Sequence, residues 1–97
     1  MKIITICGSL KFESEMKYWS ERLELDGNCV LSVIYPNREK DNYTQEEIDN
    51  LTSGHKKKID LSDAIFVINK GGYMGNSVKS EIEYAKTHHK EILFLEN

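Results

Sequence analysis

The sequence contains few cysteines and a single proline, and it lacks the spacing that marks a thiol or metal motif. Cys7 and Cys29 are far from Cys-x-x-Cys spacing, which argues against a disulfide framework and is typical of two buried thiols in a reducing cytoplasm. The three histidines are His55 and the adjacent pair His88 and His89, with no ligand spacing around them. No metal site and no cofactor are therefore predicted.

The chain also lacks an excess of basic charge and a long apolar run. Lys and Arg number 13 against 16 Asp and Glu, a net charge of −3, whereas a duplex nucleic-acid binder needs a basic face. No stretch approaches the length of a membrane span, and the apolar residues after Lys2 are too few for a signal peptide. The basic cluster at 56–58 is interpreted as a solvated helix face, with a phosphate contact as the alternative. A cytoplasmic protein with neither a membrane nor a duplex nucleic-acid partner is predicted.

The 97 residues predict one small domain, 1–97, without a linker or repeat. The apolar run at 65–68 is typical of a buried parallel strand, and Thr44 with Glu47 forms a helix-starting capping box. Apolar residues at helical spacing between 12 and 23 predict a packed helix. The expected strands are 2–7, 29–34, 64–69 and 91–95, and the expected helices are 12–25, 44–62 (with a bend at Gly54) and 77–88.

This alternation of strands and helices predicts a parallel sheet. With four strands, we expect a small doubly wound, flavodoxin- or Rossmann-like α/β fold with strand order 2-1-3-4 and helices on both faces, in three layers. The switch point then falls between the first and third strands, where such sheets bind ligands. The loops that follow these two strands should face each other across one crevice.

Both loops contain glycine, which allows the backbone to approach a ligand closely, and both lead into helix N-termini, which favour anions. The first loop lacks the G-x-G-x-x-G and Walker patterns, so dinucleotide and P-loop chemistry are not predicted, and simple chain reversal is the alternative interpretation. In the second loop, Tyr73 either stacks on a ligand ring or covers the end of the sheet. Asn76 or Ser77 is expected to cap the following helix. The candidate binding residues are Gly8, Ser9, Leu10, Gly72, Tyr73, Gly75, Asn76 and Ser77.

Glu81 is the candidate catalytic carboxylate. It is expected in the first turn of the last helix, at the edge of a buried stripe formed by Val78, Ile82 and Ala85. A carboxylate aimed inward at the carboxyl end of a strand suits a ligand site. The alternative is an acid that merely complements the helix dipole.

His55 is the second candidate catalytic residue. It shares a stripe with Ile48, Leu51 and Ile59, so its ring should point inward near the third strand. Either it is a core histidine with satisfied nitrogens, or it carries a proton near the crevice.

Two segments of the chain resemble a known family. The "CGSL" at 7–10 and the "GGY-x-G-x-S" loop at 71–77 before "EIEYA" at 81–85 resemble the nucleoside 2-deoxyribosyltransferase-like superfamily, which includes the deoxynucleoside 5′-monophosphate N-glycosidases. The resemblance covers the first ten residues and roughly the last forty. It implies cleavage of an N-glycosidic bond in a nucleoside or nucleoside 5′-monophosphate, with Glu81 as the nucleophile. It also implies a 5′-phosphate held by Gly8, Ser9, Gly75 and Ser77.

The chain departs from the family pattern at two places. The deoxyribosyltransferases carry an aspartate shortly before the glutamate, where this chain has Gly75 or Asn76, and relatives carry an acid near the position of His55. A histidine can still donate a proton to a leaving base. Three hypotheses follow: an N-glycosidase or transferase that uses Glu81 and His55, a nucleotide-binding module without turnover, and a structural subunit. Because the chain is small, we expect a homo-oligomer in which a neighbour helps to close the crevice.

Overall fold

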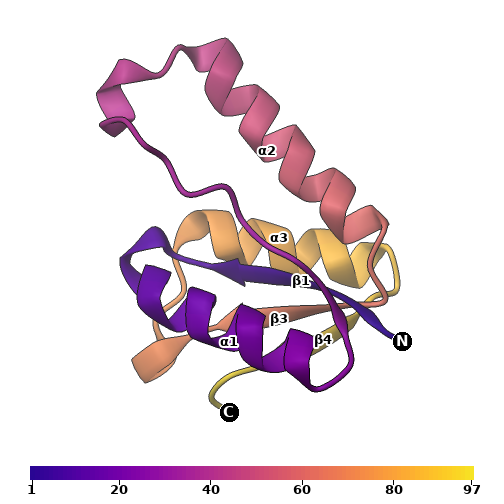
Figure 1. Ribbon diagram of the computed structural model, residues 1–97. Coiled ribbons are helices and arrows are strands. Elements are labelled where there is room, and N and C mark those ends of the chain that lie inside the picture. The colour runs from indigo at the N-terminus through magenta and orange to yellow at the C-terminus, as the bar shows by residue number, and fades with distance from the viewer.

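Four parallel strands form the central sheet of the computed structural model, which describes residues 1–97 (Figure 1). The spatial order is β2-β1-β3-β4, and all three strand pairs are parallel, as the sequence predicts. In the central pair, Gly8 lies beside Ile68, so the carboxyl ends of β1 and β3 share one edge. The strands are β1 (Ile3–Gly8), β2 (Cys29–Leu31), β3 (Ala64–Ile68) and β4 (Glu91–Phe94).

The helices cover both faces of the sheet and complete the three layers (Figure 1). Successive side chains of a strand point to opposite faces. Ile6 packs with Met16 of α1 (Glu13–Leu25) on one face, and Cys7 packs with residues of α2 (Gln45–Asp60) and α3 (Asn76–Thr87) on the other. Asp63, just before β3, accepts a 2.8 Å hydrogen bond from the Ile3 amide, so its role is structural.

The second strand is shorter than expected, because β2 ends at Leu31 rather than at residue 34. Just after β2, the Lys58 ammonium donates a 2.7 Å hydrogen bond to the Ser32 carbonyl. Ile34, two residues further on, is 62% exposed. Lys58 therefore fastens the segment after β2 to α2, a structural contact within the cluster expected to be solvated.

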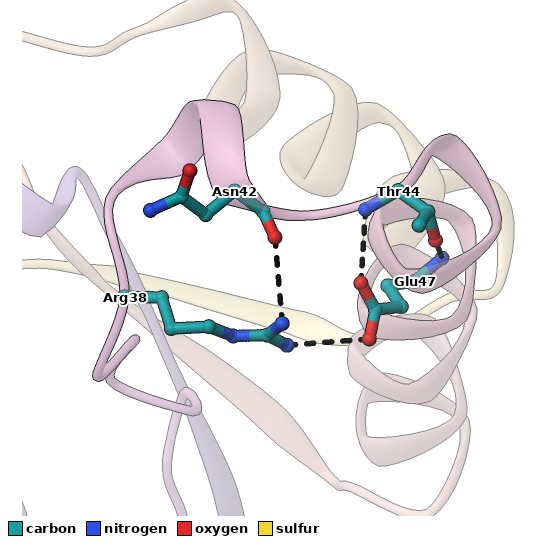
Figure 2. A network of polar contacts seen from close by, with 4 residues as sticks. All are labelled: Arg38, Asn42, Thr44 and Glu47. Carbon is teal, nitrogen blue, oxygen red and sulfur yellow. Dashed lines mark hydrogen bonds and ion pairs between the residues drawn. The ribbon is translucent and has the colours of Figure 1, made fainter.

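A network of polar contacts fixes the beginning of α2 (Figure 2). The predicted capping box is present: the Glu47 amide donates to Thr44 Oγ1 at 3.1 Å, and the Thr44 amide donates to Glu47 Oε1 at 2.9 Å. Arg38 donates to the other oxygen of Glu47 at 3.2 Å and to the Asn42 carbonyl at 3.4 Å. The loop before α2 is thus tied to the first turn of the helix.

The rest of α2 is continuous and is anchored at its far end. The bend expected at Gly54 does not occur, because the glycine keeps a negative φ and the helical hydrogen bonds continue through it. Ile59 is fully buried, and both Thr5 and Ser62 donate hydrogen bonds to the Lys58 carbonyl. The first half of α2 leans away from the sheet (Figure 1). None of the helices combines the length and the apolar character that a membrane span requires.

Candidate functional site

Three side chains from three different elements meet on the face of the sheet that α2 and α3 cover. His55 Nε2 lies 3.5 Å from Glu81 Oε1 and 3.5 Å from Cys7 Sγ. The ligand-type atoms of the three residues all lie within 4.8 Å of one another. The structure therefore brings together the two predicted catalytic residues, and it adds Cys7 to them.

Glu81 is held by α3, but not in the first turn. The helix begins at Asn76 and has no acidic residue in its first turn, so the expected first-turn position was wrong. Glu81 lies one turn later, where the effect of the helix dipole on a side-chain charge has decreased. Its side chain is 20% exposed, at the edge of a stripe whose expected members are all buried. These members are Val78, Ile82 and Ala85.

His55 lies where α2 leaves the sheet. One turn further along the helix, Ile59 is fully buried, and one turn earlier, Leu51 is 41% exposed. The His55 side chain is intermediate, at 12% exposure, and its Nε2 faces Glu81 and Cys7. The inward orientation predicted for His55 is therefore observed, within direct reach of the glutamate.

Cys7, in β1, is the site residue that sequence reasoning missed. Its thiol is fully buried beneath His55 and Glu81. Burial raises the pKa of the thiol well above its usual value, and the charge of Glu81 and a hydrogen bond to that carboxylate raise it further. The thiol is thus neutral at physiological pH. Cys29, the other free cysteine, is only partly buried.

In the first glycine loop, packing and local hydrogen bonding account for Gly8 and Ser9. A Cβ on Gly8 would lie 3.0 Å from Met16 Sδ and 3.2 Å from Ile68 Cβ, so close packing requires glycine there. Ser9 Oγ accepts a long hydrogen bond of 3.4 Å from the Lys11 amide. The Leu10 side chain is about half exposed. The polar side-chain groups of this loop are the Ser9 hydroxyl and the Lys11 ammonium, which lies over the ring of Tyr73.

The second loop uses most of its amides internally. Gly71 and Gly72 adopt a positive φ, whereas Gly75 has an extended conformation with φ −75°. The Gly71 amide donates to the Glu96 carboxylate at 3.0 Å, and the Gly72 amide donates to the Asn69 carbonyl at 2.7 Å. The Gly72 amide is therefore not free to bind an anion.

Tyr73 connects the two loops. Its ring makes an edge contact with Phe12, with 5.9 Å between the centroids, and Lys11 Nζ lies 3.3 Å from its centre. The two loops are thus neighbours across the end of the sheet. One face of the ring is covered by Lys11, which favours the covering role over a free stacking platform.

The start of α3 carries no side-chain cap. Gly75 is the N-cap residue, so the expected caps, Asn76 or Ser77, were wrong. Because the first amides of a helix have no partner within the helix, those of α3 remain available beside the glycine loops. Such amides, together with the positive end of the helix dipole, attract an anion.

Two neighbouring hollows lie beside the first half of α2, with volumes of about 300 and 280 Å³. Arg38, Tyr43 and Leu51 line both. Leu51 precedes His55 by one helical turn, so its backbone lies about 6 Å along α2 from that of the histidine. Tyr35 lines the second hollow, and its buried hydroxyl has no hydrogen-bond partner.

The chain matches no protein-family model, and no curated protein matches it. Its chemistry is therefore inferred from the site itself. A carboxylate beside an imidazole can act as a nucleophile beside a proton carrier, and here the two groups lie 3.5 Å apart. The neutral thiol of Cys7 contacts the same imidazole nitrogen.

Proposed function

We propose that this protein is an N-glycosidase or base-transfer enzyme that acts on a nucleoside or a nucleoside 5′-monophosphate. The observation that carries the proposal is the 3.5 Å approach of His55 Nε2 to Glu81 Oε1. The pair lies beside the uncapped start of α3. The resemblance of the "EIEYA" segment to the deoxyribosyltransferase-like superfamily supports the same chemistry.

In the first step, a carboxylate oxygen of Glu81 attacks the anomeric carbon of the sugar. The bond from that carbon to the base nitrogen breaks, and its electron pair goes to the base. A protonated His55 donates its proton to the leaving base, which prevents the accumulation of negative charge there. The product is a glycosyl ester of Glu81, as in retaining glycosidases.

In the second step, water or a second base attacks the same carbon. The ester bond breaks, and Glu81 recovers its carboxylate. The attacking water transfers a proton to the neutral His55, which restores the starting state of the enzyme. Cys7 takes no covalent part, because its raised pKa keeps it as a thiol.

The surroundings of the pair suit the other parts of such a substrate. A 5′-phosphate would be bound by the free amides at the start of α3 and by the Ser9 hydroxyl of the neighbouring loop. The hollows lined by Arg38, Tyr43 and Leu51 provide room and an aromatic surface for a base. Of the candidate binding residues predicted from the sequence, this proposal assigns the phosphate to Ser9 and to the backbone of Gly75, Asn76 and Ser77.

A binding module without turnover is the second candidate. The observation that favours it is the composition of the cluster, which contains a thiol and an imidazole but no second carboxylate beside Glu81. In that case, the same surface would recognise a nucleotide, and the glycosidic bond would stay intact.

Replacing Glu81 by Gln tests the proposal, because it keeps the size of the side chain and removes the nucleophile. We expect base release from a cleavable substrate to fall at least about a thousandfold. Free base is followed by chromatography over a panel of nucleosides and their 5′-monophosphates. The control is Glu83→Gln, which changes an exposed acid of the same helix and should leave turnover unchanged.

Equal turnover by the wild type and by Glu81→Gln would remove Glu81 from the mechanism. Nucleotide binding by both proteins with turnover by neither would select the binding module. Unfolding of Glu81→Gln, measured by circular dichroism, would identify a structural role for the carboxylate.

A further inference from the structure

Cys7, His55 and Glu81 supply three donor atoms of the kinds that hold a transition metal ion in proteins. They come from β1, α2 and α3, and the cysteine and the histidine are separated by 48 positions in the chain. We propose that these three residues form a zinc-binding site with one coordination position open to solvent. This proposal does not depend on the glycosidase reaction proposed above.

The spacing of the donor atoms fits a tetrahedral ion. With Zn–S near 2.3 Å and Zn–N or Zn–O near 2.0–2.1 Å, tetrahedral angles separate S from N by about 3.5 Å and N from O by about 3.3 Å. The observed separations are 3.5 Å for Cys7 Sγ to His55 Nε2 and 3.5 Å for His55 Nε2 to Glu81 Oε1, and the third pair, Cys7 Sγ and the Glu81 oxygen, lies within 4.8 Å. Two of the three separations match a bound ion, and a movement of the Glu81 side chain would close the third.

The chemical types of the three donor atoms determine which metal ions the site prefers. Thiolate and imidazole favour zinc and neighbouring transition metals, whereas magnesium and calcium prefer oxygen ligands alone. Binding breaks the S–H bond of Cys7, its proton leaves to the buffer, and no electron is transferred. The thiolate and the Glu81 carboxylate then balance the charge of a divalent ion, so that no net charge is buried.

The exposed fractions of the three side chains show from which side an ion can reach the site. Cys7 is fully buried, whereas the side chains of His55 and Glu81 are 12% and 20% exposed. The ion must enter from the side of these two residues, and its fourth position faces the same side. Three protein ligands with an open fourth position are characteristic of zinc sites that bind water or a substrate.

Zinc and a sugar compete for the same carboxylate. An ion bound to Glu81 occupies the group that would attack the anomeric carbon, so the zinc form cannot perform the reaction proposed above. Binding of zinc is measured with the metal alone, so its outcome is independent of whether any nucleotide is cleaved.

The test is a titration of the metal-free protein with Zn²⁺ in competition with a chromophoric chelator. We expect one ion per chain. Cys7→Ser and His55→Gln should each bind at least about 100-fold more weakly, since the loss of a residue that merely hydrogen-bonds to a metal ligand already weakens binding about 10- to 100-fold. The matched control is Cys29→Ser, which removes the other free thiol and should bind as the wild type does.

Co²⁺ gives an independent measurement of the cysteine ligand. A thiolate-to-cobalt charge-transfer band should appear in the wild type and in Cys29→Ser, and it should be absent from Cys7→Ser. If Cys7→Ser does not fold, His55→Gln and Glu81→Gln decide the question by the same titration. Zinc binding that survives all the site variants, or no stoichiometric binding by the wild type, would overturn the proposal.

Discussion

At the scale of single residues, the environment of Cys7 sets its protonation. The thiol is buried next to the Glu81 carboxylate, and both conditions disfavour the thiolate, so the pKa of Cys7 is raised in the folded protein. His55 Nε2 lies 3.5 Å from Glu81 Oε1, within ion-pair distance of the carboxylate. The thiol beneath them acts as a neutral neighbour in the absence of metal.

The raised pKa of Cys7 predicts a loss of stability at alkaline pH. An unfolded thiol ionises near pH 8.5, whereas the folded thiol keeps its proton, so the unfolded state binds fewer protons above about pH 8.5. The free energy of unfolding should then fall by up to about 1.4 kcal/mol per pH unit from this group alone. Below pH 8.5 both states hold the proton, and the thiol adds no pH dependence.

Urea unfolding of the wild type and of Cys7→Ala between pH 7 and 10 measures this effect. The stability difference between the two proteins should shrink as the pH rises above 8.5, since only the wild type carries the buried thiol. Cys29→Ala serves as the control and should follow the wild type. Parallel curves for the wild type and Cys7→Ala would contradict the prediction.

At the scale of the elements, Gly8 decides how closely β1 approaches α1 and β3. Its missing side chain makes room for Met16 and for Ile68. Gly54 in α2 is a contrasting glycine, because a Cβ there would meet nothing within 4 Å. Packing therefore requires the glycine at position 8, whereas the glycine at position 54 only lowers the stability of its helix.

Alanine at these two glycines should have opposite effects. Gly8→Ala should destabilise the protein by about 1–3 kcal/mol, because the added methyl group overpacks the core. Gly54→Ala should stabilise it by roughly 0.5–1 kcal/mol, because alanine is the better helix former. Both values come from urea unfolding. A stable Gly8→Ala with impaired nucleotide binding would instead assign that glycine to the ligand site.

At the scale of the whole molecule, the first half of α2 and the loop before it have little support from the sheet. Leu51 is 41% and Ile34 is 62% exposed; Leu51 lines both hollows beside α2, and Ile34 lines the second. The Arg38 network fastens the loop to α2 but not to the sheet (Figure 2). An apolar surface in this position suits the homo-oligomer expected from the size of the chain.

Sedimentation velocity should therefore detect a dimer or a higher oligomer. Leu51→Asp should raise its dissociation constant at least about tenfold, as expected when a buried interface residue is replaced by a charge. Leu25→Asp is the control, because Leu25 is an exposed leucine at the end of α1. A wild-type monomer at micromolar concentration, or equal effects of the two substitutions, would contradict this expectation.

The sequence by itself determined the element types, the strand order and the buried stripe of α3, whereas the stripe expected on α2 is buried only at its end, at Ile59. These follow from local periodicity, such as the buried run of β3 and the recurrence of apolar residues in α1, and from the rule that crossover helices join parallel strands. The capping box of α2 was equally readable, because its two residues are three positions apart. The pairing of His55 with Glu81 followed from the same stripes.

Only the tertiary structure decided which groups share the site and how the elements end. Cys7 joins His55 across 48 positions because alternate side chains of β1 face opposite layers, and no local spacing encodes that meeting. The chain after the early end of β2 contacts Lys58 of a distant helix, and α3 begins at Asn76, directly after the second glycine loop, without a side-chain cap. Periodicity reports which face of an element is buried, whereas contacts between distant elements are set by packing in three dimensions.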